Sequence, residues 1–142
     1  MTTEQKQLLI KDLSARLSHG VRCFIKDDYD VSRDGTLYEM DLDDETCGFK
    51  DTGIAQGYWY TNVVNVKPYL RPMSSMTDEE KMYVNELIYD KDGLFLSPTP
   101  TWVINECDID KYIDFCNSKH LDWRGLIPMG LALSAPDGMY EF

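Results

Sequence analysis

The sequence lacks several features that would define its class at once. No apolar run approaches the roughly 18 residues that cross a bilayer, and the first residues, MTTEQKQLLIKDL, lack the basic and apolar regions of a signal peptide. The sequence therefore predicts a cytoplasmic protein without a membrane partner. The chain also has no GxGxxG, GxxxxGK[ST], GxSxG or HExxH motif, which argues against the familiar nucleotide-dependent and hydrolase classes.

Cysteine is scarce. The chain has four, Cys23, Cys47, Cys107 and Cys116, with no CxxC pair among them. Because a reducing compartment keeps such residues as thiols, we expect small buried hydrophobic side chains and no disulfide framework. With 142 residues, 43% of them hydrophobic, the chain is able to bury a core. We predict a single domain over residues 1–142, with a β-rich part at 20–72 and an α-rich part at 73–142.

Positive charge is scarce as well. Lys and Arg number 14 against 25 Asp and Glu, so the formal net charge is −11, which argues against direct binding to nucleic acid. Nine carboxylates lie between Asp27 and Glu45 against the single cation Arg33. Spread over one face, this segment would mimic DNA phosphates toward a nucleic-acid-binding protein. Dispersal of the carboxylates over separate turns would contradict mimicry.

The acidic run Asp41–Glu45 is also a candidate Ca²⁺ or Mg²⁺ site, since hard cations prefer several converging carboxylates. Together with His120, these groups would make the centre of an unfamiliar metal-dependent or acid/base enzyme. The run does not have the spacing of an EF-hand loop, so a solvated turn is the favoured interpretation.

A zinc site is a second metal hypothesis. Cys116 and His120 are four residues apart on a predicted helix and would point to the same side. Two ligands do not make a site, and Cys107 and His19 would complete it only if the fold brought them near. We therefore predict no metal and no cofactor.

Hydrophobic periodicity predicts an α+β fold. An N-terminal helix with a Thr2/Gln5 capping box is expected to end at Gly20. Strands are predicted at 21–26, 36–42, 46–50 and 58–66, with a loop over 27–35, as an antiparallel meander or a small, partly closed β-barrel. In the second strand, Tyr38, Met40 and Leu42 are expected to share one face. Further along, the patterns predict a helix at 78–89, a short strand at 94–96, and a helix that starts at the N-cap Asp108.

The run Tyr58-Trp59-Tyr60 stands out within the predicted strand at 58–66. In a strand, Tyr58 and Tyr60 share one face and Trp59 takes the other. A stacking platform for bases or sugars is one interpretation, but no basic patch flanks the run, so packing in the core or at an interface is favoured. At least one of the two faces is a candidate surface for a protein partner.

The segment around HLDWRGL, residues 120–126, is dense in polar and aromatic side chains. An ion pair between Asp122 and Arg124 is expected to brace a turn while Trp123 covers the edge of the core. We favour closure of the domain by its last strand as the role of this segment. The alternative is a recognition surface formed by His120, Trp123 and Arg124.

Two segments resemble a known group of proteins: KPYLRPMSSMTDEE at 67–80 and the segment 114–140, together roughly a third of the chain. They resemble uncharacterised small proteins encoded by gut Bacteroides-type bacteria and by their phages and mobile elements. The resemblance implies a phage or mobile-element setting. It carries over no activity, ligand or site residue.

The first of these segments also has a local explanation. Pro68 and Pro72 are expected to end the preceding strand, and Thr77 and Glu80 have capping-box spacing at the start of the next helix. Arg71 is then a lone cation before an acidic first turn. We predict that Arg71 braces this segment against the body of the domain, so that its loss lowers stability more than it alters binding.

These features favour a non-enzymatic, acidic accessory protein that acts through protein–protein interaction. The candidate contact residues are Tyr58, Trp59, Tyr60, His120, Trp123 and Arg124. The alternatives are the enzyme with the Asp41–Glu45 carboxylates and a structural component of a larger assembly. The identity of the partner and the oligomeric state stay open at the level of sequence.

Overall fold

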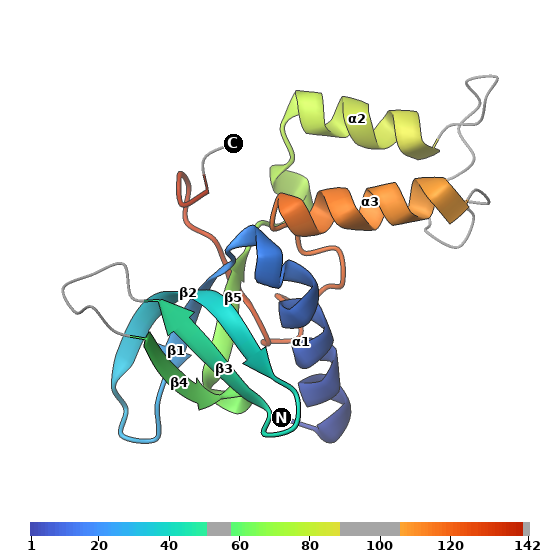
Figure 1. Cartoon of the computed structure of the whole chain (residues 1–142). Coiled ribbons are helices and arrows are strands. Elements are labelled where there is room, and N and C mark those ends of the chain that lie inside the picture. The colour runs from blue at the N-terminus through green and yellow to red at the C-terminus, as the bar shows by residue number, and fades with distance from the viewer. Residues whose placement is uncertain (51–57, 89–105, 141–142) are drawn as a thin grey trace.

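The computed structural model describes residues 1–50, 58–88 and 106–140 (Figure 1). The helices in these ranges are α1 (Thr3–Arg16), α2 (Asp78–Ile88) and α3 (Glu106–Ser118). The strands are β1 (Arg22–Lys26), β2 (Ser32–Asp41), β3 (Thr46–Lys50), β4 (Tyr58–Asn62), β5 (Val66–Leu70) and β6 (Leu133–Ser134), with 3-10 turns η1 (Leu17–His19), η2 (Val63–Asn65) and η3 (Met73–Ser75). The predicted α+β class is confirmed. The strand predicted at 94–96 lies outside the described residues.

The strands form one sheet in the order β4-β3-β2-β1-β5-β6. β1 to β4 are an antiparallel meander, while β5 returns to pair with the other side of β1 and β6 adds in parallel through Tyr69 and Leu70. β4 and β6 are therefore the two edges, and no described strand joins them. The predicted meander is confirmed, whereas the sheet is open and the alternative of a partly closed barrel is not formed.

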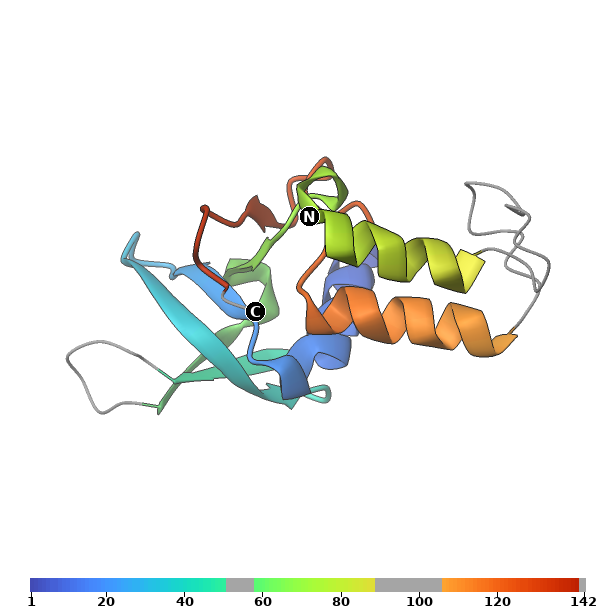
Figure 2. The same cartoon turned by 90° about the horizontal axis from the view of Figure 1, so that it is seen from above.

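α1 packs against one face of this sheet, and α2 and α3 lie side by side as a pair that extends away from it (Figure 1 and Figure 2). The predicted capping box starts α1, with Gln5 N–H donating to Thr2 Oγ1 at 3.1 Å, and Gly20 at φ +66° ends the first helical segment. The core between α1 and the sheet consists of Leu9, Ile10, Leu13, Val21, Cys23, Ile25, Leu37, Cys47, Phe49, Val63, Val66, Leu70, Leu126, Leu131 and Ala132.

β2 differs from its prediction at both ends. It begins at Ser32, inside the predicted loop, because Arg33 pairs with Ile25 of β1. A β-bulge between Leu37 and Glu39 then shifts the alternation, so Leu37 and Met40 both pack toward the core while Tyr38 lies on the opposite face. The predicted shared face of Tyr38, Met40 and Leu42 is therefore wrong, and Leu42 is 63% exposed in the following turn.

The long strand predicted at 58–66 is also broken. Asn62 Oδ1 accepts a hydrogen bond from Val64 N–H at 3.1 Å, which starts η2 and ends β4. The chain then crosses to the far side of β1 as β5. Pro68 lies inside β5 opposite Cys23, so the prediction that it ends a strand is wrong.

The predicted helix at 78–89 is confirmed as α2 with its capping box: Glu80 N–H donates to Thr77 Oγ1 at 3.2 Å, and Thr77 N–H to Glu80 Oε1 at 2.9 Å. α3 starts at Glu106, so Asp108 lies inside its first turn and is not its N-cap. The rings of Tyr83 and Phe115, 4.8 Å apart, hold α2 against α3.

Cys23, Cys47 and Cys116 are free and buried, as predicted for small hydrophobic side chains. Burial raises the pKa of the Cys47 thiol to about 12 and that of Cys116 to about 11. The side chain of Cys107 lies outside the described residues. Among the helices of the described ranges, none combines the length and the apolar character that a transmembrane segment needs.

Candidate functional site

The face of the sheet turned away from α1 carries two tyrosines that meet across β3. The hydroxyl groups of Tyr38 and Tyr60 are hydrogen-bonded at 2.7 Å, and the Tyr60 hydroxyl also donates to Glu39 Oε2 at 3.2 Å. Lys50 Nζ lies 5.7 Å from the centroid of the Tyr38 ring. Tyr60 remains 58% exposed. We call Tyr38, Glu39, Gly48 and Tyr60 the tyrosine surface.

Gly48, in the strand between the two tyrosines, is what lets the rings lie over the sheet. A Cβ at this position would stand 2.8 Å from Tyr60 Cε1 and 3.1 Å from Tyr38 Cε1, so any other residue would displace the rings. Rings that already sit in one arrangement lose little conformational entropy when a partner covers them. The surface is therefore exposed, aromatic and pre-organised.

Of the predicted aromatic run, only Tyr60 is shown to belong to this surface. Trp59 points to the opposite face, stacked on Phe49 at 5.1 Å between ring centroids, with the Arg33 guanidinium 4.8 Å from its ring. Tyr58 pairs with Lys50 in the sheet, and its side chain lies outside the described residues. The alternation expected for Trp59 and Tyr60 is confirmed.

Sequence reasoning did not select Tyr38, Glu39 or Gly48 as contact residues. The available signal was a glycine in the middle of the strand between two tyrosine-bearing strands, a pattern in which aromatic rings cover the glycine. The bulge conceals this signal, because regular alternation puts Tyr38 on the same face as Met40, whereas the structure puts it on the opposite face.

A buried charge cluster of Asp12, Arg16 and Arg124 ties α1 to the chain after α3. The side chains of Asp12 and Arg16 are fully buried and joined twice, by Arg16 Nε to Asp12 Oδ2 at 2.9 Å and Arg16 Nη2 to Asp12 Oδ1 at 3.2 Å. Arg16 Nη2 also donates to the Leu121 carbonyl at 2.7 Å, and Arg124 Nε to Asp12 Oδ1 at 3.2 Å. Arg124 therefore stabilises the packing of its segment against α1.

The predicted ion pair between Asp122 and Arg124 is therefore wrong, because Arg124 reaches Asp12 on α1. Asp122 braces the turn in another way, by accepting hydrogen bonds from the backbone N–H groups of Leu126 at 2.7 Å and Ile127 at 2.9 Å. Trp123 donates to Asn117 Oδ1 at 2.9 Å, and the Arg124 guanidinium covers its ring at 4.1 Å.

His120 lies in the interior and not at a surface. It is 3% exposed, adopts φ +57° and stacks on Tyr140 with ring centroids 4.0 Å apart. The structure thus places Trp123 and Arg124 half-buried beside a buried His120, and the three do not form one exposed patch. Burial, reinforced by the charges of Arg16 and Arg71, lowers the pKa of His120 to about 4.

This pKa predicts a loss of stability in mild acid. The unfolded chain takes up a proton at His120 near pH 6.5, whereas the folded chain stays neutral until about pH 4, so stability falls as the pH drops through this window. The contribution of this group between pH 7 and pH 5 is expected to be about 2 kcal/mol. Urea denaturation of the wild type and of His120→Asn, which tolerates the left-handed backbone, measures it. Equal pH slopes in the two proteins would contradict it.

Arg71 makes the bracing contact that its position predicted. Its guanidinium binds Glu80 through both terminal nitrogens, Nη1 at 2.9 Å and Nη2 at 2.7 Å, and donates to the carbonyls of Ser75 at 3.1 Å and Lys119 at 3.3 Å. The backbone of Arg71 also pairs with the chain at Leu121. Arg71 therefore joins β5, the start of α2 and the end of α3.

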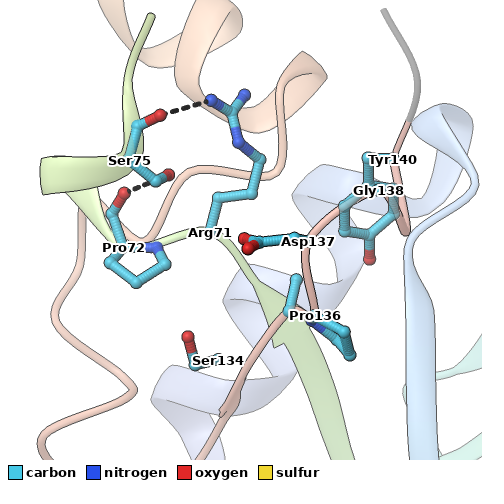
Figure 3. A pocket seen from close by; sticks show the side chains of 9 residues that line it. Arg71, Pro72, Ser75, Ser134, Pro136, Asp137, Gly138 and Tyr140 are labelled. Carbon is cyan, nitrogen blue, oxygen red and sulfur yellow. Dashed lines mark hydrogen bonds between the residues drawn. The ribbon is translucent and has the colours of Figure 1, made fainter.

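A cavity of about 240 Å³ lies beside Arg71, between η3 and the chain at 134–140 (Figure 3). Figure 3 shows the Arg71 guanidinium turned toward the Ser75 carbonyl, and Asp137 and Ser134 also line the cavity. Tyr140 closes one side and donates to the Tyr69 carbonyl at 2.7 Å. The cavity is smaller than the roughly 300 Å³ of the smallest typical ligand pockets. We therefore interpret it as a gap at the junction between the C-terminal segment and β5, and not as a ligand site.

The carboxylates of the hypothetical enzyme are not brought to His120. Asp41 Oδ1 accepts the N–H groups of Asp43 at 3.0 Å and Asp44 at 3.1 Å, which is a solvated turn. Glu45 pairs with Lys6 near the start of α1. The Leu121 carbonyl, next to His120, accepts a hydrogen bond from Arg16 at the end of α1. Lys6 and Arg16 are about 15 Å apart along the helix. No three His, Cys, Asp or Glu side chains among the described residues are grouped as metal ligands would be.

The nine carboxylates of the acidic segment lie in two turns and in the strand between them. Asp27, Asp28 and Asp30 lie before β2, Asp43 to Glu45 after it, and Asp34, Glu39 and Asp41 within it. Asp34, between them, accepts a hydrogen bond from Tyr69 at 2.9 Å. The idea that this segment mimics DNA stays a prediction.

Comparisons with known proteins give no indication of function. No protein family matches the chain, and no curated protein or solved structure matches it either. What the fold and the site define is a class, an α+β protein with an open sheet and an exposed aromatic face. The resemblance to proteins of phages and mobile elements stays a prediction.

Proposed function

We propose that this protein is a non-enzymatic accessory module that binds another protein through the tyrosine surface. The observation that carries the proposal is the tyrosine pair held over Gly48, with Tyr60 58% exposed. Tyrosine is enriched among the residues that dominate binding energy at protein interfaces, because it offers a large contact area and a hydroxyl at small entropic cost.

The sequence supports a setting for the proposed module. The resemblance of segments 67–80 and 114–140 supports an accessory role in a phage or mobile element, and the chain would act in the cytoplasm of the host. The net charge of −11 favours a basic protein as partner over nucleic acid.

Affinity capture from the native host tests the proposal. We expect the wild type to retain a specific protein over a range of salt concentrations, and the double variant Tyr38→Ala/Tyr60→Ala to retain at least about tenfold less of it. Tyr29→Ala is the matched control, because Tyr29 is 88% exposed in the turn before β2 and is not part of the tyrosine surface. Equal capture by the double variant would show that the surface is wrong, and no specific capture at any salt concentration would contradict the function itself.

A further inference from the structure

β4 is an unprotected edge of the sheet. No strand among the described residues pairs with its outer side, and its sequence YWYTN contains no charge and no proline. Natural sheets usually protect an edge with a charged side chain, a proline, a bulge or a very short strand. The opposite edge follows this rule, since β6 has two residues. Alternate residues of β4 therefore point backbone N–H and C=O groups outward with no strand partner among the described residues, and Asn65 Nδ2 donates to Thr61 Oγ1 at 3.1 Å near one end.

The tyrosine surface adjoins this edge. Tyr60 is the central residue of β4, and its exposed ring lies beside Tyr38 and Glu39 on the face of the sheet that is turned away from α1. A strand added to β4 would run past Tyr60, so its side chains would contact the ring while its backbone bonded to β4. One partner segment would then use both features.

The two ends of β4 differ in charge. At the Asn62 end lies the acidic turn, since Asn62 pairs with Thr46 and the Glu45 carbonyl accepts Val63 N–H at 2.9 Å. At the Tyr58 end lies Lys50, its partner in β3. The exposed carboxylates of the turn, Asp43 and Asp44, would attract cations at the Asn62 end alone.

We propose that the partner adds a strand to β4 and carries lysine or arginine at the end that lies beside Asn62. This inference rests on the proposed function and names the chemistry of its partner. A second copy of the chain fits less well, because each copy carries a net charge of −11 and the two would repel each other.

Strand peptides test the inference on the intact protein. The probes are peptides of about ten alternating valine and threonine residues, with two lysines at one end or with two glutamates in their place. At millimolar concentration we expect the lysine peptide to protect the outward-facing backbone amides of Tyr58–Asn62, which do not bond to β3, from hydrogen exchange, measured by NMR. Its affinity should exceed that of the glutamate peptide about tenfold at low salt, and the ratio should shrink at high salt.

Two double variants with the same change in net charge distinguish the effect of the acidic turn from the effect of the overall charge of the molecule. Asp43→Asn/Asp44→Asn should abolish the preference for lysine, whereas Asp110→Asn/Asp114→Asn, on the exposed side of α3, should leave it intact. Equal binding of the glutamate peptide would overturn the charge assignment, and outward-facing β4 amides that gain no protection would overturn strand addition. Protection that rises with protein concentration without peptide would show that a second copy is the occupant. If the β4 amides stay exposed while capture in the host still depends on Tyr38 and Tyr60, the proposed function stands without this inference.

Discussion

Replacement of Asp12 by Ala is expected to lower the free energy of unfolding by about 4 kcal/mol, because it removes the counter-ion of a fully buried arginine. Asp12 and Arg16 are both 0% exposed, and Asp12 also accepts from Arg124. An unpaired guanidinium in the interior keeps its desolvation cost without the compensating attraction. Urea denaturation at pH 7 measures the loss.

Two further variants show whether the charge pairing is the cause. Asp114→Ala, an exposed aspartate on α3, should change stability by less than about 0.5 kcal/mol. The double variant Asp12→Leu/Arg16→Met should be more stable than Asp12→Ala, because removing both charges removes the unpaired one. A loss below about 1 kcal/mol in Asp12→Ala, or an equally unstable double variant, would contradict this explanation.

Replacement of Arg71 by Ala is expected to lower the free energy of unfolding by about 3 kcal/mol, since it breaks a bidentate ion pair and leaves the largely buried Glu80 without its cation. The Arg71 and Glu80 side chains are 13% and 11% exposed. Arg71→Lys should recover part of the loss, because a lysine keeps the charge but cannot bind both carboxylate oxygens in the same plane. Partner capture should be unchanged in folded Arg71→Ala, and a variant that keeps its stability but loses capture would make Arg71 a binding residue.

The same pair predicts a pH window. Arg71, chiefly through its hydrogen bonds, and the Thr77 N–H hold the pKa of Glu80 at about 2, below its usual value of about 4.5. A lowered carboxylate pKa stabilises the folded state above pH 4.5, and this contribution is lost as the pH falls toward 2. In Arg71→Ala the loss over this window should be smaller, as acid titration of unfolding will show.

Local rules predicted the elements whose signals lie in adjacent residues. The capping boxes of Thr2 and Thr77, the strand at 46–50 and the helix α2 depend on nearby hydrogen bonds and periodicity, and they were found. The bracing role of Arg71 followed from its charge beside an acidic helix start.

Features set by tertiary pairing were missed. The bulge at Tyr38 depends on how β2 meets β3, and the buried pair of Asp12 and Arg16 has the spacing of an ordinary exposed helix pair. Arg124 reaches Asp12 from 112 residues away, which no local pattern encodes. His120 is a candidate surface residue only in the alternative interpretation of its segment, and its burial under Tyr140 depends on the course of the C-terminal segment, which local patterns do not encode.

Site-specific photo-crosslinking in the native host tests the central claim most directly. A photoreactive residue in place of Lys50, at the border of the tyrosine surface, is compared with one in place of Lys111, exposed on α3. The proposed function predicts a discrete protein adduct at position 50 that disappears in the Tyr38→Ala/Tyr60→Ala background, and none at position 111. Adducts at position 111 alone, or equal adducts at both positions in that background, would contradict it.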